Sequence, residues 1–267
     1  MTANRIFTSR IQPLLPKLKM RLQEREGHLE AQRAGKDGIE VKYIADVYTG
    51  FSEKFGLPRQ SGIVPELTGR IVFRPEFRNP DALREIEKFT HLWILFDFSL
   101  AHRAEWSPQV RPPRLGGNRR VGVFASRSPF RPNPIGLSCV KLEKVSETEN
   151  EGKVLIVSGI DVVSGTPVID IKPYLPISDC RPDAAGGYSD EMAGYELNVE
   201  FAPGVYEKIP ENDRDAVTGC IKSDPRPSYH DDPERVYGMV YNGLEIKFKV
   251  SEGTAYVLSA EETDNDS

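Results

Sequence analysis

Residues 91–98 read HLWILFDF, a nearly all-apolar run of the kind that forms a strand covered on both faces. Shorter runs with strand character stand on both sides of it: Ile39–Tyr43, Arg70–Phe73, Arg120–Ala125, Ile135–Leu142, Val154–Ile160 and Val168–Ile171. Only one clear helix is predicted among them, from the Asn79 cap to about Thr90. Since a parallel α/β sheet needs a crossover helix after most strands, the sequence predicts a mainly β fold, a barrel or a sandwich.

A second, smaller unit is predicted from Gly204 onward. Its centre is a hairpin, because two alternating runs flank Asn242-Gly243, and Asn-Gly is the strongest short-range hairpin signal. The expected elements of this unit are a partly helical stretch, Val205–Lys222, and three strands, Val236–Tyr241, Leu244–Val250 and Ala255–Leu258. A chain that ends near Gly204 is therefore expected to keep a folded core.

The whole chain is predicted to divide into four parts. They are an N-terminal helical extension (1–38), a single β domain (39–203), a small α+β C-terminal domain (204–260) and a disordered acidic tail (261–267). Within the extension, an amphipathic helix is expected from about Lys17 to Ala34. Tyr195–Phe201 alternates strictly and is expected to close the sheet of the β domain.

Composition limits the class of protein. The chain has 267 residues, 39% of them hydrophobic, and no apolar run approaches the roughly 18 residues that a membrane helix needs. No signal peptide is recognisable, so a cytoplasmic location is expected. The three cysteines are widely spaced and the four histidines lack ligand spacing, which predicts no metal site and no disulfide framework.

Positive charge is concentrated in one stretch, although the net charge is −5. From Arg103 to Lys141 there are eight Lys or Arg residues and one acid, Glu105. Such an excess marks a candidate contact for an anionic partner, with a solvated basic loop as the alternative. The arginines alternate with apolar residues among prolines and glycines, which favours the first interpretation.

Four segments are too polar and too stiff for a simple core. They read KFGLPRQSG (54–62), RPPRLGGN (111–118), VFASRSPFRPNPIGLS (123–138) and GIDVVSGTPVIDIKPY (159–174). Three prolines in the third segment restrict its backbone, so Arg127, Arg131 and Asn133 are expected on a preorganised loop. Four such segments in one domain indicate a functional site.

In this order, together with FTHLWILF (89–96) and DPRPSY (224–229), these segments resemble the TrmO family, also called YaeB or TsaA-like. The resemblance covers about Val41 to Ala260. It implies an S-adenosylmethionine-dependent methyltransferase that acts on the N6 nitrogen of threonylcarbamoyladenosine, next to the anticodon of tRNA. It also implies a β-barrel core instead of a Rossmann sheet, a small C-terminal domain and a homodimer. No GxGxxG loop follows any predicted strand, in agreement with that expectation.

The resemblance also implies which residues bind the cofactor. By position in the family's motifs they are Pro58, Arg59, Gln60, Ser99, Leu100, Arg127, Leu137, Asp161, Val162, Val163 and Ser164. The sequence departs from the family at two of them. Ser99 stands where members often carry His, and Ser164 replaces the Asp of an Asp-Gly-Thr-Pro loop. A role for a side-chain carboxylate at 164 is therefore in doubt, whereas backbone contacts there survive the change.

Methyl transfer is an in-line displacement, so the protein mainly has to align the reacting groups. Asp170 is the leading candidate for orientation or proton acceptance, with Lys172 and Tyr174 as polar supports. A turn-stabilising hydrogen bond is an equally open role for Asp170. The RNA strand is expected at the remaining arginines of the basic stretch, Arg111, Arg114, Arg119, Arg120 and Arg131.

Two other classes of function remain open at this point. A non-catalytic RNA-binding barrel would need exposed aromatic rings among the basic residues, and only Trp106, Phe124 and Phe130 are nearby. A hydrolase would use Ser126, Ser128 or Cys139 as nucleophile. No GxSxG motif is present, and no histidine is close to these residues in sequence.

Overall fold

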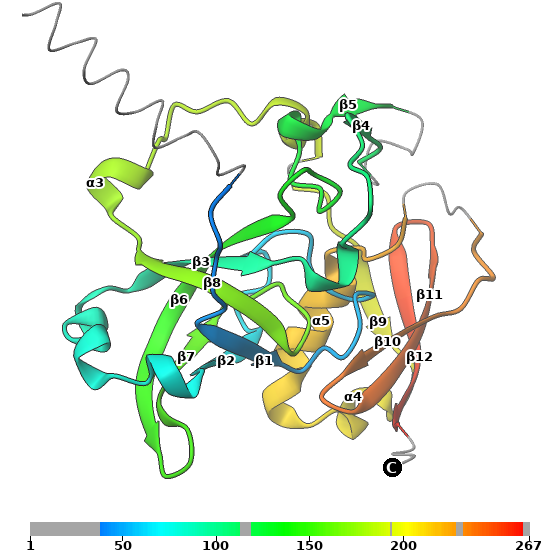
Figure 1. Cartoon of the computed structure of the whole chain (residues 1–267). Coiled ribbons are helices and arrows are strands. Elements are labelled where there is room, and N and C mark those ends of the chain that lie inside the picture. The colour runs from blue at the N-terminus through cyan, green and yellow to red at the C-terminus, as the bar shows by residue number, and fades with distance from the viewer. Residues whose placement is uncertain (1–37, 113–118, 193, 228–231, 264–267) are drawn as a thin grey trace, which may run out of the picture. The chain divides into compact units, whose positions relative to one another are not determined.

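The computed structural model describes residues 38–112, 119–192, 194–227 and 232–263. The chain divides into two compact units, Met1–Lys42 and Tyr43–Ser267. Only residues 38–42 of the first unit are described, and they form neither helix nor strand. The helix expected from Lys17 to Ala34 lies outside the described residues. All described helices and strands belong to the second unit (Figure 1).

Six strands of the second unit close into a barrel. In order around it they are β1 (Ala45–Thr49), β2 (Thr68–Phe73), β7 (Gly152–Ser158), β6 (Ile135–Thr148), β3 (His91–Asp97) and β8 (Thr166–Pro173). Each strand is antiparallel to both neighbours. Alternate side chains point inward and form one buried cluster, with Val47, Ile71, Leu92, Ile94 and Leu155 at its centre. The predicted mainly β barrel fold is confirmed.

Strand β6 changes partner along its length. Its first half pairs with β3 and its second half with β7, and the two ladders meet at Lys141. The backbone N–H of Cys139, in the first half, donates instead to Ser61 Oγ at 3.0 Å. Nearby, the Gly62 N–H donates to the Gly159 carbonyl at 2.9 Å. The loop that precedes Gly62 therefore lines the edge of β6 that β7 leaves free.

Two of the predicted strands are wrong. Ile39–Tyr43 forms no strand, and the first strand begins at Ala45. Arg120–Ala125 contributes only the two-residue strand β5 (Val121–Gly122), which pairs with β4 (Gln109–Val110) outside the barrel. In both cases an alternating pattern was present. Alternation indicates which side chains would be buried, but a strand also needs a backbone partner, and the pattern does not supply one.

The helix predicted from Asn79 to Thr90 is also wrong, because the chain forms two separate 3-10 turns, Pro80–Leu83 and Ile86–Lys88. Asn79 does cap the first turn, since its side chain accepts the Asp81 N–H at 3.0 Å. Glu85 then adopts a φ of 71°, which a right-handed helix does not allow. The predicted apolar side still packs against the barrel through Leu83, Ile86 and Phe89.

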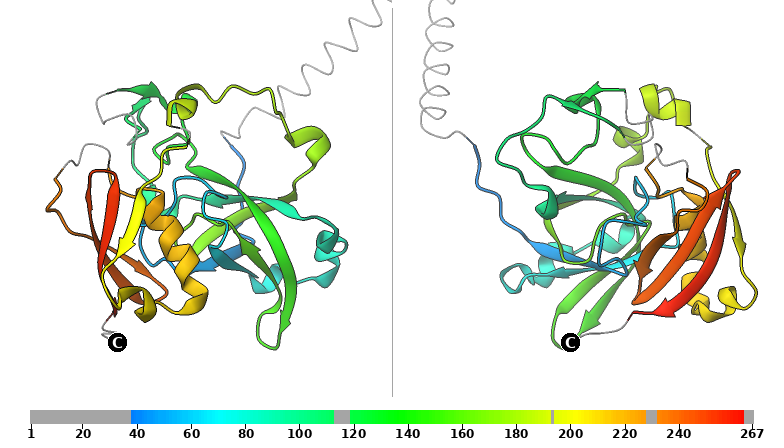
Figure 2. Two further views of the ribbon diagram at one scale, coloured as in Figure 1. Left: turned by 180° about the vertical axis from the view of Figure 1, so that it is seen from behind. Right: turned by 90° about the vertical axis from the view of Figure 1, so that its right-hand side faces the viewer.

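The C-terminal part of the chain forms a separate four-stranded sheet. Its strands, in order, are β10 (Tyr237–Tyr241), β11 (Leu244–Ser251), β12 (Thr254–Glu262) and β9 (Asn198–Phe201). Short helices α3 (Pro176–Asp179) and α4 (Val205–Lys208) and the longer α5 (Arg214–Lys222) complete the fold. Figure 2 shows α5, in orange, against one face of this sheet. The Asn-Gly hairpin prediction is confirmed, because Asn242 and Gly243 have φ of 49° and 76° between β10 and β11.

Two expectations for this part of the chain are wrong. Tyr195–Phe201 does not close the barrel, because β9 is the parallel partner of β12 in the C-terminal sheet. Its alternation predicts a strand but cannot select the sheet. The acidic tail begins later than residue 261, since β12 continues to Glu262 and the Thr263 N–H donates to the Gly243 carbonyl at 2.8 Å. Backbone pairing with β11 is compatible with acidic side chains on the exposed face.

The core beneath the C-terminal sheet contains side chains from the β domain. Phe51, Val64 and Leu67 are exposed by only 1%, 2% and 1%, and they belong to the same cluster as the inward side chains of β10, β11 and β12. Removing the C-terminal part would bring these three side chains into water. The structure therefore does not support the expectation that a chain ending near Gly204 keeps a folded core.

Candidate functional site

Three of the polar segments converge on Asp161, which lies just beyond the end of β7. Its carboxylate accepts a hydrogen bond from Ser138 Oγ, on β6, at 2.5 Å. The backbone of Ser61 also hydrogen-bonds to it, and the charge of Arg127 acts on it. Asp161 therefore connects the 54–62 segment, the first half of β6 and the proline-containing loop before β6, which carries Arg127.

Burial raises the pKa of Asp161 above its ordinary value. The Ser138 hydrogen bond, backbone N–H groups and the charge of Arg127 act in the opposite direction without outweighing burial. The carboxylate is thus kept in a place where ionisation is unfavourable. Residues with such perturbed pKa values concentrate at functional sites.

Gln60 and Arg127 lie 67 residues apart in sequence and are in direct contact. Arg127 Nη1 donates to Gln60 Oε1 at 2.5 Å, and Gln60 Nε2 donates to the Arg59 carbonyl at 2.5 Å. Pro58, just before them, is buried. The structure therefore brings Pro58-Arg59-Gln60, called here the PRQ segment, together with Arg127, as expected if both belong to one site.

The PRQ segment is also attached to the C-terminal part of the chain. Arg59 Nη2 donates to the Arg226 carbonyl at 2.8 Å. The Arg226 side chain pairs in turn with both carboxylate oxygens of Asp224, at 2.8 and 3.0 Å, and the Tyr195 hydroxyl donates to the same carboxylate at 3.1 Å. Asp224 and Arg226, the described residues of the DPRPSY motif that make these contacts, therefore hold Arg59 in place.

Two exposed leucines offer apolar surface near these polar groups. Leu100 lies in the 3-10 turn Ser99–Ala101 that follows β3, and Leu137 lies on the outer face of β6; their exposed fractions are 67% and 45%. The Leu100 carbonyl accepts a hydrogen bond from Lys54 Nζ at 3.2 Å, which joins this turn to the 54–62 segment. An apolar group of a ligand would find contact here.

The three residues after Asp161 have a different role. Val162 and Val163 are buried, and the Val162 carbonyl accepts a hydrogen bond from Thr49 Oγ1 at 3.0 Å. Ser164 Oγ accepts the Thr49 N–H at 3.3 Å. These contacts hold the loop against β1. Of the four loop residues, only Asp161 therefore belongs to the polar cluster that it forms with Ser138, Ser61 and Arg127. A hydroxyl suffices for the contact that Ser164 makes.

The predicted catalytic residues lie on β8 and just after it. Lys172 Nζ pairs with Asp170 at 2.6 Å, and the Tyr174 ring lies 5.7 Å from that of Trp93. Leu95 on β3 is paired with Leu137 on one side and with Asp170 on the other. Directly paired residues point to the same face, and adjacent strands are about 4.8 Å apart. Leu137 and Asp170 therefore share the outer face of the barrel, with one strand between them.

The arginines predicted to contact RNA have unequal freedom. Arg111 and Arg120 are exposed, whereas Arg119 Nη1 is bound to both carboxylate oxygens of Glu191, at 2.9 and 3.0 Å. Arg131 Nη1 donates to the Ser126 carbonyl at 3.1 Å, which braces its own loop. Arg114 lies outside the described residues.

One polar cluster was not predicted from the sequence. Asp97, at the end of β3, is 5% exposed; it accepts the Tyr43 hydroxyl and pairs with His102 Nε2, both at 2.7 Å. This carboxylate fixes the imidazole of His102 beside the Ser99–Ala101 turn. The only signal in the sequence was an acid at the end of an otherwise apolar strand.

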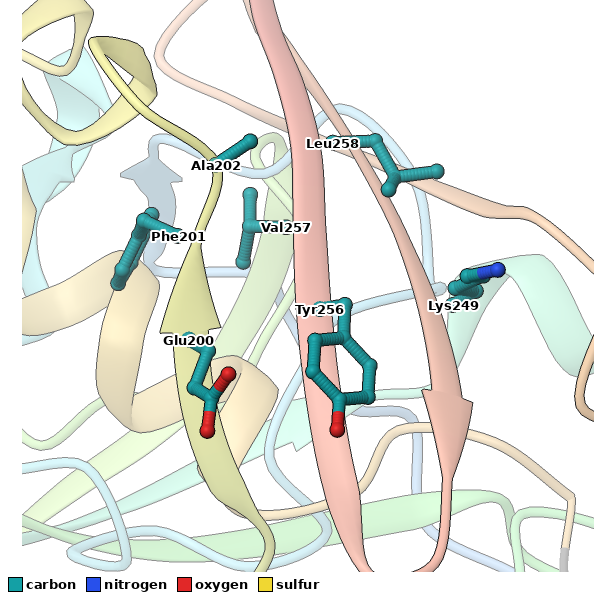
Figure 3. A pocket seen from close by; sticks show the side chains of 7 residues that line it. All are labelled: Glu200, Phe201, Ala202, Lys249, Tyr256, Val257 and Leu258. Carbon is teal, nitrogen blue, oxygen red and sulfur yellow. The ribbon is translucent and has the colours of Figure 1, made fainter.

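A shallow pocket lies elsewhere, on the outer face of the C-terminal sheet. Tyr256 on β12 stands between Glu200 on β9 and Lys249 on β11, and Leu258 and Ala202 complete the rim (Figure 3). None of the predicted site residues lines this pocket. It is therefore separate from the Asp161 cluster.

The hydrolase interpretation finds no support. Ser126 Oγ donates to the Val123 carbonyl at 2.8 Å, Ser128 Oγ accepts the Phe130 N–H, and burial raises the pKa of the Cys139 thiol. In the part of the chain that the structure describes, no group of three or more His, Cys, Asp or Glu side chains is placed to hold a metal ion. The same part contains no helix long and apolar enough to cross a membrane.

Two family models match the chain, the tRNA-methyltransferase O N-terminal domain over residues 46–180 and the TrmO C-terminal domain over residues 194–263. A tRNA (adenine(37)-N6)-methyltransferase of Escherichia coli is 36% identical over 231 residues, which are 84% of this chain and 98% of that protein. A protein of the same name from Eikenella corrodens is 47% identical over 171 residues, 63% of this chain and 95% of that protein. The crystal structure of TrmO from Pseudomonas aeruginosa superposes with a TM-score of 0.69 at 31% identity, and the match covers 84% of this chain and 98% of that one.

Proposed function

The chain belongs to the tRNA-methyltransferase O family, and on that premise we propose that it transfers a methyl group from S-adenosylmethionine to the N6 nitrogen of adenosine 37 in tRNA. The observation that carries the proposal is the contact of Gln60 with Arg127 beside the buried Asp161. Three segments that are distant in sequence supply these groups, close to the end of β7. A core packing requirement does not explain an amide, a guanidinium and a carboxylate at that place.

The groups at this place fit the cofactor chemically. S-adenosylmethionine, when bound, supplies a methyl group on a sulfonium sulfur and presents a carboxylate, an ammonium group and an adenine ring. We assign Arg127 and Gln60 to the polar end of the cofactor, because a guanidinium and an amide recognise a carboxylate well. Leu100 and Leu137 offer the exposed apolar surface that an adenine ring or a thioether stem prefers. Asp161 positions the other groups through Ser61, Ser138 and Arg127.

The reaction also requires that the target nitrogen lose its proton. We propose that the adenosine carries a threonylcarbamoyl group, which makes the N6 proton more acidic, so that a carboxylate of ordinary strength suffices as acceptor. Asp170 lies on the same outer face as Leu137, one strand away, and is the proposed acceptor or orienting group. Lys172 Nζ lies 2.6 Å from an Asp170 carboxylate oxygen and holds that side chain in place. Tyr174 supports the face by packing against Trp93.

The tRNA is proposed to lie across the basic stretch, with exposed Arg111 and Arg120 contacting phosphates. We further propose that the protein works as a homodimer in the cytoplasm, as the family resemblance implies. We also propose that the chain is divided into a β domain, which binds the cofactor, and a C-terminal α+β domain, which supports it. Through the contact of Arg226 with Arg59, the second domain supports the cofactor segment of the first.

One experiment tests the proposed function directly. Purified protein is incubated with S-adenosylmethionine carrying a deuterated methyl group and with two tRNA preparations, one with and one without the threonylcarbamoyl modification. Nucleosides are then analysed by mass spectrometry. A labelled methyl group on the modified adenosine is expected, with little transfer to the unmodified tRNA. Absence of transfer to both preparations, with tRNA still bound, would instead support the non-catalytic RNA-binding barrel.

A further inference from the structure

Two large aromatic rings are exposed side by side on the segment that joins β3 to β6. Trp106 is 49% exposed and Phe124 is 73% exposed. Their centroids are 6.1 Å apart and their planes are inclined by 28°, so the rings are stacked. Neither ring belongs to a hydrophobic core cluster of the described residues. The fold therefore leaves two aromatic faces in contact with solvent.

The backbone on either side of the two rings is held firmly. The Val123 N–H donates to the Pro108 carbonyl at 3.0 Å, which ties the turn that carries Phe124 to the segment that carries Trp106. Val123 itself is 1% exposed and anchors the 3-10 turn Val123–Ala125. The two rings are thus presented on a fixed base. A preorganised contact of this kind loses little conformational freedom when a ligand binds.

The segment that carries the two rings is rich in arginine. Exposed Arg111 directly follows β4 and exposed Arg120 directly precedes β5. The Arg103 guanidinium stacks on Phe130, 3.5 Å from the ring centroid. Glu105 is the one acid that sequence places in this stretch. A planar stacking surface surrounded by cations fits a single-stranded nucleic acid, which offers flat bases on an anionic backbone.

We propose that Trp106 and Phe124 form a stacking platform for one unpaired base of the tRNA anticodon loop, next to the base that is methylated. The proposal rests on the proposed function. The target adenosine must leave its stack to reach the reaction site, and this removes a stacking partner from its neighbour. The platform replaces that partner. Its role is binding and placement of the substrate, and it takes no part in proton transfer.

The test measures tRNA binding and turnover separately in single variants. Phe124→Ala and Trp106→Ala are each expected to raise the KM for tRNA by about 10-fold, the loss of one base-stacking contact. The kcat at saturating tRNA should stay within about 3-fold of the unmodified protein, because the reacting groups are untouched. Calorimetric affinity for S-adenosylmethionine should not change. Phe124→Tyr should retain the unmodified KM, whereas Phe124→Leu, apolar but without a stacking face, should resemble Phe124→Ala.

A matched control removes an exposed aromatic ring at another place. Tyr256, on the C-terminal sheet, is 36% exposed and stands between Glu200 and Lys249 (Figure 3). Tyr256→Ala should leave the KM for tRNA unchanged. Since Trp106 and Phe124 lie outside both cores, their alanine variants should also unfold at nearly the same temperature as the unmodified protein. This separates loss of the platform from loss of the fold.

A second readout needs no turnover. In tRNA with 2-aminopurine at a loop position beside the target adenosine, fluorescence should fall on binding, and Phe124→Ala should abolish that fall. An unchanged KM with unchanged quenching in both alanine variants would overturn the platform while methyl transfer continues. A Phe124→Leu variant that behaves as the unmodified protein would overturn it too. So would alanine variants whose mass in solution differs from that of the unmodified protein, because the rings would then be a contact between copies of the chain. Quenching without methyl transfer would contradict only the proposed function.

Discussion

Asp161 and Asp224 are both shielded acids with an arginine nearby, yet the fold treats them in opposite ways. At Asp224, burial alone would raise the pKa, but the two-pronged contact with Arg226 and the Tyr195 hydroxyl outweigh it, and the net pKa is lowered. At Asp161 burial raises the pKa, and the Ser138 hydrogen bond and the charge of Arg127 lower it without outweighing burial, since the Arg127 guanidinium donates to Gln60. A charge-balanced pair stabilises the fold, whereas a buried acid with a raised pKa is typical of a functional site.

The largest loss of stability is expected when the C-terminal part, which contains Asp224, is removed and the part that contains Asp161 is kept. A chain ending at Gly204 loses the sheet that covers Phe51, Val64 and Leu67. Exposing three large apolar side chains costs roughly 1.5–3 kcal/mol each, a substantial share of the stability of a typical domain. The truncated chain should therefore be insoluble or unfolded by circular dichroism. A soluble fragment with a cooperative melting transition and full cofactor affinity would show that the barrel core is independent.

The next effect concerns the arginine beside Asp161. Arg127→Lys keeps the charge, but a lysine lacks the planar guanidinium that donates to Gln60 and that we propose recognises the carboxylate of the cofactor. Turnover should fall by about 100-fold, the scale expected when a positioned group is misplaced. Steady-state kinetics over a salt series is the measurement. Arg120→Ala serves as the control, because Arg120 is a proposed phosphate contact, and its loss should change the KM for tRNA and its salt slope while kcat stays within a few fold.

A matched pair of substitutions tests the two acids directly. Asp224→Asn leaves Arg226 without its charged partner in a place where both side chains are only 13% exposed. Removing one member of such a pair should cost about 2–4 kcal/mol. Asp161→Asn removes an unfavourable charge and keeps a hydrogen-bond acceptor, so stability should stay the same or rise by up to about 1 kcal/mol. Urea denaturation gives both values. A larger loss for Asp161→Asn than for Asp224→Asn would reverse the comparison.

The smallest effect is the dependence of these differences on pH. The folded pKa of Asp224 is lowered, so its contribution is present above the ordinary aspartate pKa of about 3.9 and is lost as pH falls through the folded value. The folded pKa of Asp161 is raised, so its unfavourable contribution disappears as pH falls through that value. As pH falls from 7 to about 4, the wild-type protein should therefore gain stability relative to Asp161→Asn. Below about pH 4 it should lose stability relative to Asp224→Asn. Parallel slopes in urea titrations would contradict this assignment.

Some of the fold could be predicted from local pattern alone. The apolar run at 91–98 is β3, the alternation at 244–250 is β11, and Asn242-Gly243 makes the turn before it, because each depends on neighbours in sequence. Glu85 shows the limit of this approach. Its left-handed backbone splits the predicted helix at a residue whose type gives no warning, so a regular apolar side was compatible with two 3-10 turns as well as with a helix.

The candidate site was predictable only in part. The motifs identified Gln60, Arg127 and Asp161 as members of one site, and the structure places the first two in contact and the third beside them. The pattern could not distinguish Asp161 from Val162 and Val163, which are buried against β1. It also did not predict the pairing of Asp97 with His102, because an acid at the end of an apolar strand does not by itself identify its partner.

By itself the sequence determined the class of fold and the hairpin, and it proposed the residue types of the candidate site, since these follow from apolar periodicity, turn chemistry and charge. Only the tertiary structure decided that β9 joins the C-terminal sheet, that Phe51 and Leu67 are shared with its core, and that Leu137 and Asp170 face the same way. The reason is physical. Strand pairing, shared burial and the balance of charge around an acid depend on contacts between residues far apart in the chain, which no local pattern specifies.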